Sequence, residues 1–258
     1  TRDDTGGSTT TSGTATPTQT STPTPAASVS LLSLQPAVVT FGTDSISVSG
    51  ETSQYLFVDL AVEDGDPPAV EEFRFRFSGV ETTPLEPREP YWVEYNPGET
   101  RYSRETGTGR LVFDLPATGD ATSAALQWPG GEWTPPAALR DRLAAPPPPL
   151  SLEWSVPETA EVRTTPTLTF TVTNSGDLPG RFVGALNRTG PRVAYAPITA
   201  ISRLIPADET VTFDVTDRFD LDDPGDDEVG DDQTDLSYIL DTLDGQRRAE
   251  VRLVEQRG

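Results

Sequence analysis

The chain has 258 residues, a formal net charge of −22 at pH 7, and 19 basic residues that are all arginine. The absence of cysteine and histidine excludes disulfides, thiolate and histidine metal sites, and catalysis by Ser-His or Cys-His pairs. Without lysine there is no Schiff base and no Ser-Lys dyad, and no basic stripe is available to neutralise the phosphates of a nucleic acid.

The first stretch, residues 1–27, consists mainly of Thr, Ser, Gly and Pro and has almost no large side chain. Such a composition cannot bury enough apolar surface to offset the entropy lost on ordering, so we expect a disordered tether. Ser/Thr-Pro tracts of this kind are typical of extended stalks that carry O-glycans. A plain interdomain linker is the alternative interpretation.

Residues 28–143 show short runs in which apolar and polar side chains alternate, which is the pattern of half-buried β-strands. The strongest run, residues 55–62, places four aliphatic side chains on one face. In residues 73–77 three phenylalanines alternate with Arg74 and Arg76, so we expect the rings in a core and the arginines against acidic groups in solvent. Burial of each ring is worth about 2 kcal/mol.

Further strands and one helix complete the pattern expected for this region. The additional strands are predicted at residues 29–34, 46–48, 111–115 and 126–128. A short helix is predicted to begin at Pro135 and Pro136, with Thr134 as its N-cap, and to end near Leu143. Many short strands separated by turn signals indicate a β-sandwich.

Three short segments of this region, residues 54–62, 96–99 and 109–116, resemble an immunoglobulin-like lipoprotein domain of unknown function. The second segment carries a Pro-Gly-Glu turn, and the third carries a Gly-x-Leu-Val-Phe strand that ends at a proline. The resemblance covers most of residues 30–130. It implies an immunoglobulin-like fold and a location on the cell surface, and it implies no reaction.

Residues 144–149, with the sequence Ala-Ala-Pro-Pro-Pro-Pro, form the predicted boundary between two domains. A run of prolines adopts polyproline II geometry at about 3.1 Å per residue and acts as a semi-rigid spacer. Because the spacer is short, we expect the two domains to hold a limited range of mutual orientations.

The second domain, residues 150–258, contains the clearest strand pattern of the chain. In residues 167–173, apolar side chains alternate with threonines, which suit the solvent face of a sheet. Residues 193–204 show no clear pattern. The other predicted strands lie at residues 154–156, 182–186, 211–215, 236–240 and 249–254, the last two joined as a hairpin by a turn at 243–245.

Residues 171–177 and 205–213 are similar to two motifs of the cell-adhesion-related domain found in bacteria and archaea. That family usually has glycine in the turn of the second motif, where Ala207 or Asp208 stands here. The resemblance covers about residues 151–254 and implies a seven-stranded sandwich used as a surface module. The predicted fold class is therefore all-β, with two immunoglobulin-like β-sandwich domains in tandem, of which the second is of the adhesion type.

An acidic run from Asp220 to Asp235 is the first candidate binding site. Carboxylate oxygens are preferred ligands of Ca²⁺, and the candidate ligands are Asp222, Asp226, Asp231 and Asp235. The spacing lacks the EF-hand pattern of alternating aspartates, a glycine and a final glutamate. The alternative is a solvated loop whose charges repel one another in a salt-adapted protein. Apart from Ca²⁺, no cofactor is expected.

Five aromatic residues, Tyr91, Trp92, Tyr95, Trp128 and Trp133, form the second candidate site. Aromatic rings can stack on sugar rings, which predicts a carbohydrate-binding platform. The alternative is packing at a sandwich edge or between domains, where each such ring buries about 150–250 Å².

Asn187-Arg-Thr189 fits the N-glycosylation motif at the expected end of a strand, so Asn187 is a candidate glycan acceptor in a secreted protein. No catalytic residue is singled out. With 41 acidic residues in the chain, a close pair of carboxylates is expected by chance, so the carboxylate pair of a glycoside hydrolase has no distinguishing motif here.

The composition also indicates an environment. An acidic excess without lysine resembles the proteins of salt-in halophilic archaea, in which high salt screens the repulsion among acidic groups. The Thr-rich start is similar to the segment that follows the lipid-modified cysteine of haloarchaeal lipoproteins. These resemblances imply an extracellular protein on the cell surface, tethered to the membrane by its N-terminus. An ordinary acidic secreted protein is the alternative.

The sequence therefore favours a non-enzymatic, lipid-anchored cell-surface display or adhesion protein of a halophilic archaeon, with a cell-envelope protein or glycan as its partner. A carbohydrate-binding or substrate-capture lipoprotein is the first alternative, and a carboxylate-based glycoside hydrolase is the second. No nucleic acid is expected as a partner, and contact with a membrane is expected only through the N-terminal lipid anchor. The oligomeric state is left open.

Overall fold

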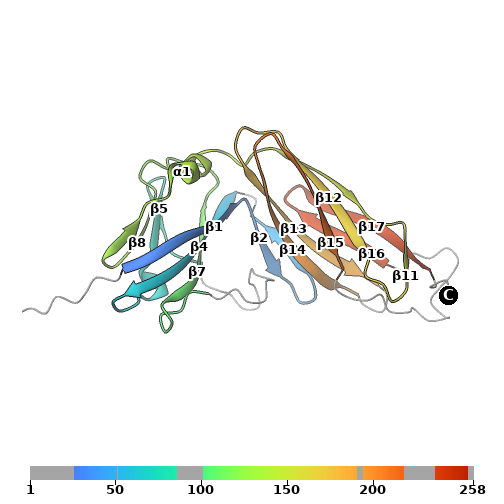
Figure 1. Cartoon of the computed structure of the whole chain (residues 1–258), viewed down its shortest axis with the longest axis horizontal. Coiled ribbons are helices and arrows are strands. Elements are labelled where there is room, and N and C mark those ends of the chain that lie inside the picture. Colours follow the sequence, from blue (N-terminus) through green and yellow to red (C-terminus); the bar gives the residue numbers. More distant parts are fainter. Residues whose placement is uncertain (1–25, 51, 86–100, 191–193, 218–235, 255–258) are drawn as a thin grey trace, which may run out of the picture.

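The computed structural model describes residues 26–50, 52–85, 101–190, 194–217 and 236–254. Within these residues the fold is all-β, as predicted: two β-sandwiches stand in tandem along the long axis, with a two-stranded hairpin between them (Figure 1). The one α-helix of the described chain lies on the first sandwich, next to the linker (Figure 1).

The first sandwich consists of two antiparallel sheets in the described residues. One sheet has the order β1 (Ala26–Gln35), β4 (Ser53–Asp64), β7 (Thr108–Pro116). The other has the order β6 (Val80–Thr82), β5 (Arg74–Phe77), β8 (Ala125–Trp128), β9 (Gly131–Trp133), and a 3-10 turn at Val70–Glu72 precedes β5. Strand β1 thus begins ahead of the domain start expected at residue 28.

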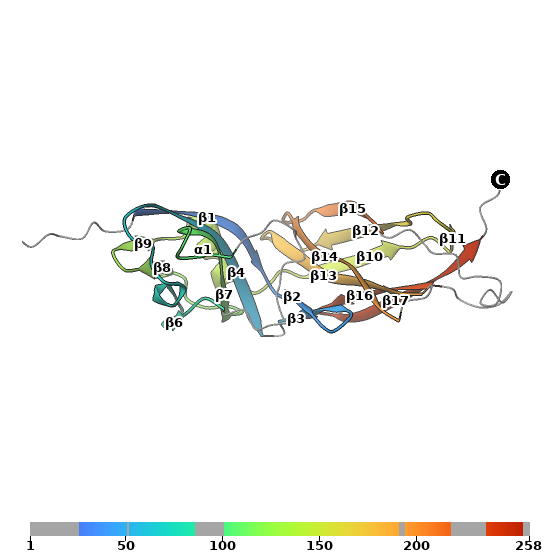
Figure 2. The same cartoon turned by 90° about the horizontal axis from the view of Figure 1, so that it is seen from below.

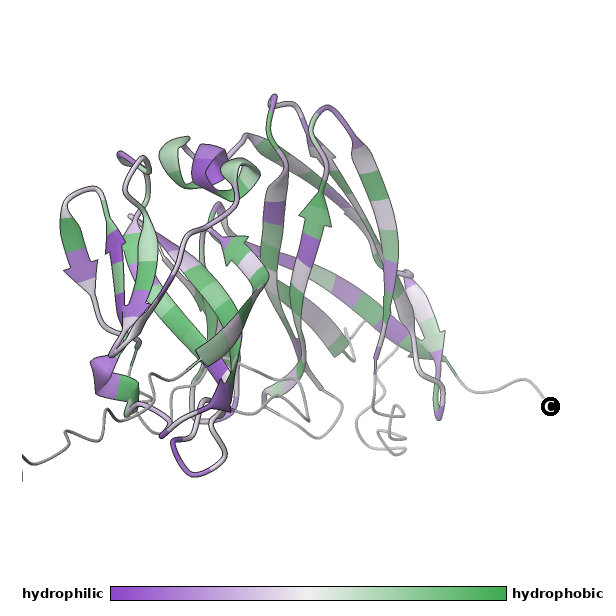
Figure 3. Ribbon diagram, turned by 60° about the vertical axis from the view of Figure 1, so that its left-hand side comes forward, coloured by the Kyte–Doolittle hydropathy of each residue, from purple (hydrophilic) through white to green (hydrophobic). Residues whose placement is uncertain are grey.

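The core of the first sandwich lies between these sheets, and the predicted alternation explains it. Leu56, Val58 and Leu60 of β4 are buried in one cluster with all three phenylalanines of residues 73–77. The ring of Phe75 lies 5.6 Å from that of Phe113 on β7. The alternating apolar and polar bands along the strands in Figure 3 show the same period of two.

The two arginines of β5 leave the core on the outer face of the sheet. Arg76 lies 4.0 Å from the carboxylate of Glu132, so it meets an acidic group as expected. Arg74 instead donates to the backbone carbonyls of Glu71 and Phe73. The expectation of an acidic partner for Arg74 was therefore wrong, because carbonyls of the preceding turn lie within its reach.

Helix α1 spans Ala137–Ala144 and follows the proline pair. Its N-cap is Pro136 in an extended conformation, and no side chain caps the helix. The predicted N-cap at Thr134 was therefore wrong: the two prolines keep the chain extended for longer, so the helix begins after them.

The helix ends against the first sandwich. Leu139 and Leu143 are buried in the core of that sandwich. The buried amide of Gln54 on β4 donates to the carbonyl of Leu143 at 3.0 Å and to that of Pro116 on β7 at 2.9 Å. One side chain thereby satisfies a carbonyl at the helix end and ties it to the sheet.

The second sandwich also consists of two sheets in the described residues. The smaller sheet has the order β10 (Leu150–Ser155), β12 (Thr167–Asn174), β15 (Thr210–Thr216). The larger has the order β11 (Thr159–Glu161), β17 (Gly245–Val254), β16 (Leu236–Thr242), β13 (Gly180–Thr189), β14 (Ala196–Ile205), with β11 parallel to β17.

Strand β12 alternates as predicted between a core face and a solvent face. Its side chains Leu168, Phe170 and Val172 are fully buried, and the ring of Phe170 stacks on that of Phe213 at 5.4 Å. Its threonines face outward and bond to side chains of β15: three pair with threonine hydroxyls, as Thr171 does with Thr212 at 3.1 Å, and Thr169 donates to the carboxylate of Asp214. The hydroxylated face expected from the sequence is therefore confirmed.

Asn174 joins the two motifs on which the second resemblance rests. Its buried side-chain amide donates to the carbonyls of Leu178, Ile205 and Pro206 at 2.9, 3.2 and 3.0 Å. Asp208, in the turn where the family usually has glycine, adopts a φ of 53°. This is the left-handed region that glycine enters without strain and aspartate tolerates better than most residues.

Strand β14 occupies the stretch in which the sequence showed no clear pattern. Its buried residues are Ile198, Ile201 and Ile205, whose spacing of three and four is typical of a helix face rather than a strand. The pairing of β13 with β14 shifts register between Leu186 and Asn187. This irregularity interrupts the period of two and explains why the strand was not predicted.

Strands β2 (Val38–Phe41) and β3 (Ile46–Ser49) form an antiparallel hairpin between β1 and β4 in the chain. The hairpin leaves the first sandwich and lies against the outer face of the larger sheet of the second (Figure 2). Residues 28–143 therefore contribute to both sandwiches, although the linker at 144–149 separates the two along the chain.

Candidate functional site

One of the five aromatic residues predicted as a sugar-binding platform is a core residue. Trp128 is 8% exposed, and its ring lies 6.3 Å from that of Phe73. The structure thus contradicts its assignment to a platform, because burial in the sandwich leaves no ring face for a sugar. Trp133 is partly buried and packs against the same cluster, and its role stays a prediction. The other three lie outside the described residues: Tyr91, Trp92 and Tyr95.

The candidate calcium ligands Asp222, Asp226, Asp231 and Asp235 lie outside the described residues. Over the part of the chain that the structure describes, no group of three or more acidic side chains could hold a metal ion. Asp217 and Leu236, which lie on either side of residues 218–235, are both buried in the second sandwich.

Asn187, the candidate glycan acceptor, is buried between the two halves of the molecule and is only 2% exposed. Its side-chain oxygen accepts from the backbone N–H of Ile46 at 2.8 Å, and its side-chain nitrogen donates to the carbonyl of Ile46 at 2.8 Å. A glycan would have to be attached to that nitrogen. The structure therefore contradicts the assignment, because the motif lies in an interface rather than at an exposed strand end.

The contact that holds Asn187 is part of a polar site between distant parts of the described chain. On the neighbouring strand β16, a carboxylate oxygen of Asp241 accepts from the backbone N–H of Val48 at 2.8 Å. At the base of the hairpin, the hydroxyl of Ser202 on β14 donates to the side chain of Gln35 at 2.8 Å. Three strands of the second sandwich thus hold the hairpin and the end of β1.

An apolar cluster lies beside these polar contacts. Ala37 and Ile46 from the hairpin region pack against Val183 and Ala185 of β13, and all four are 5% exposed or less. Gly50 closes the base of the hairpin with a φ of 146°, and a Cβ there would lie 2.7 Å from a backbone oxygen. The chain can therefore return to β4 only with glycine at this position.

This site was not predicted, although the sequence carried a signal for it. Residues 182–186 form an unbroken apolar run, which is typical of a strand covered on both faces. Asn187 follows directly, so a polar side chain enters the same covered strand and requires partners. The sequence did not indicate which segment supplies the cover, because the hairpin precedes β13 by more than a hundred residues.

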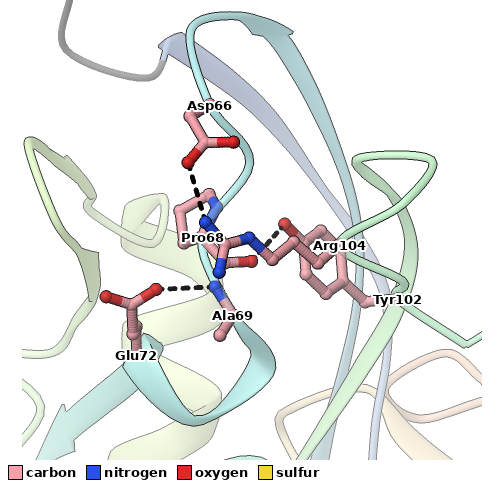
Figure 4. Close-up of polar contacts among 6 residues, drawn as sticks. All are labelled: Asp66, Pro68, Ala69, Glu72, Tyr102 and Arg104. Carbon is pink, nitrogen blue, oxygen red and sulfur yellow. Dashed lines mark hydrogen bonds and ion pairs between the residues drawn. The ribbon is translucent and has the colours of Figure 1, made fainter. Parts of the chain in front are cut away.

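A second polar cluster braces the loop that follows β4 (Figure 4). Arg104 donates to the carboxylate of Asp66 at 2.7 Å, and the pair is largely exposed. The carboxylate of Glu72 accepts from the backbone N–H of Ala69 at 2.6 Å. An exposed pair of this kind contributes about 0–1 kcal/mol, so its role is to shape the loop.

Tyr102 anchors the same loop from the inside. Its hydroxyl donates to the carbonyl of Pro68 at 2.8 Å (Figure 4). Its ring and that of Phe73 meet edge to face, with their centres 5.0 Å apart. Burial raises the pKa of Tyr102, so the phenol stays protonated and keeps donating. The carboxylates of Asp66 and Glu72 also hold this loop, through their bonds to Arg104 and to the backbone of Ala69.

A buried ionic network lies at the end of the second sandwich that is remote from the linker. Arg188 lies 3.2 Å from the carboxylate of Asp217, and the two side chains are 5% and 0% exposed. The hydroxyl of Tyr238 donates to the same carboxylate oxygen at 2.9 Å. Burial, and next the charge of Asp217, raise the pKa of Tyr238 well above its usual range.

The fold and these sites define an all-β protein of two sandwiches that are braced against each other by a hairpin. No protein-family model matches the chain, and no curated protein matches it. Among the helices of the described residues, none combines the length and apolar character needed to cross a membrane.

The similar solved structures include three of a β-glucosidase from Listeria innocua. The enzyme without ligand is 15% identical over 41% of this chain and 16% of the glucosidase chain, with a TM-score of 0.31. The complex with glucose is 14% identical with the same coverage and a TM-score of 0.30. A mutant in complex with laminaribiose is 13% identical over 54% and 18%, with a TM-score of 0.31. This chain thus spans less than a fifth of the glucosidase, and similarities this weak carry no argument about function.

Proposed function

We propose that the chain is a cell-surface display or adhesion module of a halophilic archaeon, tethered to the membrane through its Thr-rich N-terminal stretch. The observation that carries the proposal is the position of the two ends of the described fold. The start of β1 and the end of β17 lie at opposite ends of the long axis (Figures 1 and 2). A tether at the N-terminus would therefore hold the second sandwich away from the membrane.

The remote end of the second sandwich is suited to such presentation. Strand β11, the end of β17 and the Arg188–Asp217 pair all lie there. The buried network fixes the chain on both sides of residues 218–235, so this end is presented on a rigid support. With a net charge of −22, the molecule would repel anionic surfaces at low salt, and high salt screens that repulsion. Short-range contacts with an envelope protein or glycan can then form.

The absence of cysteine allows a sharp test of location. We expect Thr165→Cys, at an exposed position next to β12, to react with a membrane-impermeant maleimide on intact producing cells as strongly as after lysis. Phe170→Cys, at a buried position of the same sandwich, is the matched control and should react only when the protein is unfolded. Labelling of Thr165→Cys only after lysis would contradict the proposal.

The class of partner is tested by sedimentation with purified cell envelopes in high salt. The proposal expects the protein to sediment with intact envelopes, and to lose that binding when the envelopes are stripped of either surface protein or surface glycan. The carbohydrate-binding alternative expects binding to disappear only after deglycosylation, and to be abolished by Trp92→Ala. Failure to sediment with any envelope preparation would contradict both.

A further inference from the structure

We propose that the β2–β3 hairpin is an intramolecular clamp that joins the two sandwiches into one cooperative unit, so that the halves stay together even when the linker is cut. The receiving surface, called here the docking face, consists of the outward side chains of Val183, Ala185 and Asn187 on β13 and of Asp241 on β16. This proposal goes beyond the proposed function and does not depend on it.

The first support is that the docking face takes the place of a missing strand. Strand β3 pairs with β2 along one edge. Along its other edge, the backbone groups of Ile46 and Val48 are bonded to side chains of the second sandwich. The side chain of Asn187 accepts from the N–H of Ile46 and donates to its C=O, as the backbone of a neighbouring strand would. The carboxylate of Asp241 accepts from the N–H of Val48, two residues further along β3. The spacing matches the period of two along a strand.

The second support is that neither partner is complete alone. Strand β13 is buried on both faces, because Phe182 and Leu186 enter the core of the second sandwich while Val183 and Ala185 contact the hairpin. Without the hairpin, the docking face would expose apolar side chains and the buried amide of Asn187. Exposure of the apolar side chains is unfavourable, and the amide of Asn187 would lose its two bonds to Ile46, so removal of the hairpin should destabilise the second sandwich as well.

The third support is that the interface excludes water from its polar groups. Asn187 is 2% exposed and Ile46 is 2% exposed, so their two hydrogen bonds lie in a dry environment. A hydrogen bond in such surroundings is expensive to break when one partner is left without a substitute. These hydrogen bonds therefore fix which residue of the hairpin lies opposite which residue of the docking face, while the apolar contacts hold the two surfaces together.

A cut in the linker tests the clamp in the full chain. A protease site is inserted between Ala145 and Pro146, and the folded protein is cleaved in high salt and passed over a size-exclusion column. We expect the two fragments to elute together as one species of the original size. Elution as two separate folded fragments would overturn the proposal, because the linker alone would then hold the halves together.

Two variants of the hairpin identify the contact that is responsible. Ile46→Asp places a charge in the buried apolar cluster that contains Val183 and Ala185, and we expect the cleaved fragments to separate. Ser47→Asp is the matched control, because it adds the same charge to the same strand at an exposed position, and its fragments should stay together. Equal behaviour of the two variants, whether joined or separate, would contradict the clamp.

Asn187→Asp provides a milder change that keeps the shape of the side chain. It preserves the acceptor for the N–H of Ile46 but sets a second oxygen against the carbonyl of Ile46. The affinity between the fragments should fall about tenfold or more, as expected when a buried hydrogen bond is replaced by repulsion. Circular dichroism is used to check that the variant folds, and calorimetry of the uncut chain should resolve two transitions in place of one. An unchanged affinity and a single transition in the folded variant would overturn the proposal.

Discussion

At the scale of single residues, the buried carboxylate of Asp217 illustrates how a charge is accommodated in the second sandwich. It faces the guanidinium of Arg188 and accepts from the hydroxyl of Tyr238. Because its side chain is 0% exposed, the cost of removing it from water is offset only while these partners remain. Strands β13 and β16 of the larger sheet are therefore joined to the end of β15 through one carboxylate.

We expect Asp217→Asn to lower the free energy of unfolding by about 3–5 kcal/mol, because it removes the negative charge that faces Arg188 in a buried pair. Tyr238→Phe removes one hydrogen bond to a charged group and should lower it by about 1.5–3 kcal/mol. Chemical denaturation in high salt measures both. Asp214→Asn, on the exposed face of the preceding strand, is the matched control and should change stability by about 1 kcal/mol or less.

The pH dependence of stability follows from the titratable residues. The chain has no histidine, cysteine or lysine, so its stability should be nearly constant between about pH 6 and 9. Burial raises the pKa of Tyr55, Tyr102 and Tyr238 above the usual value of 10.0. Above pH 10 the folded chain retains tyrosine protons that the unfolded chain loses. The contribution of the buried tyrosines to the free energy of unfolding is therefore complete below pH 10 and falls as the pH rises further.

Thermal denaturation in high salt from pH 6 to pH 11 measures this dependence. The expected result is a plateau followed by a fall of the midpoint at the alkaline end, with a shallower fall in Tyr238→Phe. A steep change within the plateau range, or an identical alkaline slope in the variant, would contradict the assignment of the effect to buried tyrosines.

At the scale of single elements, the hairpin β2–β3 depends on the backbone at Gly50. Gly50→Ala should open the base of the hairpin, because the residue has a φ of 146° and its Cβ would meet a backbone oxygen at 2.7 Å. Hydrogen exchange of the amides of Ile46 and Val48, which donate to the docking face, should become faster.

Gly79→Ala is the control for backbone strain alone. Gly79 has a φ of 76°, and a Cβ there would meet nothing within 4 Å. This variant should lose about 1–2 kcal/mol of stability without faster exchange in the hairpin. If Gly50→Ala exchanged no faster at Ile46 and Val48 than Gly79→Ala, the closure assigned to Gly50 would be wrong.

In β12 and the phenylalanine segment at 73–77, one face is buried and the other is wetter, which leaves a period of two in the sequence. Strand β13 was predicted from the unbroken apolar run at 182–186, because both of its faces are covered. In β14 the register shift beside Asn187 interrupts the period, and the strand was not predicted. Local pattern therefore identifies a strand where its environment repeats with the pleat or where a whole segment is apolar.

The candidate sites were less accessible to sequence reasoning, for a related reason. Trp128 is of a residue type that is common in sugar-binding platforms, and only its position in the sandwich shows that it belongs to the core. Asn187 carries a glycosylation motif, and its buried place depends on a hairpin far away in the chain. A motif of three residues reports local chemistry, while exposure is decided by contacts between distant segments.

At the scale of the whole molecule, two apolar cores and a third apolar cluster under the hairpin hold a strongly acidic chain together. Nearly all acidic side chains of the described residues are exposed or half-buried, and Asp217 is the buried exception. Like charges on a compact surface repel one another, and unfolding relieves that repulsion by moving them apart.

The salt dependence of stability tests this balance. Ionic strength shortens the screening length from about 10 Å at 0.1 M to about 3 Å at 1 M, so repulsion among exposed carboxylates should fade as salt is added. We expect the denaturation midpoint to rise steeply with NaCl at low concentration and then to level off as screening saturates. Sucrose at matched osmolality is the control: it strengthens burial without screening charge, so it should raise the midpoint much less at low ionic strength. A midpoint that is independent of NaCl, or that responds equally to sucrose, would contradict an electrostatic origin and with it the adaptation to high salt.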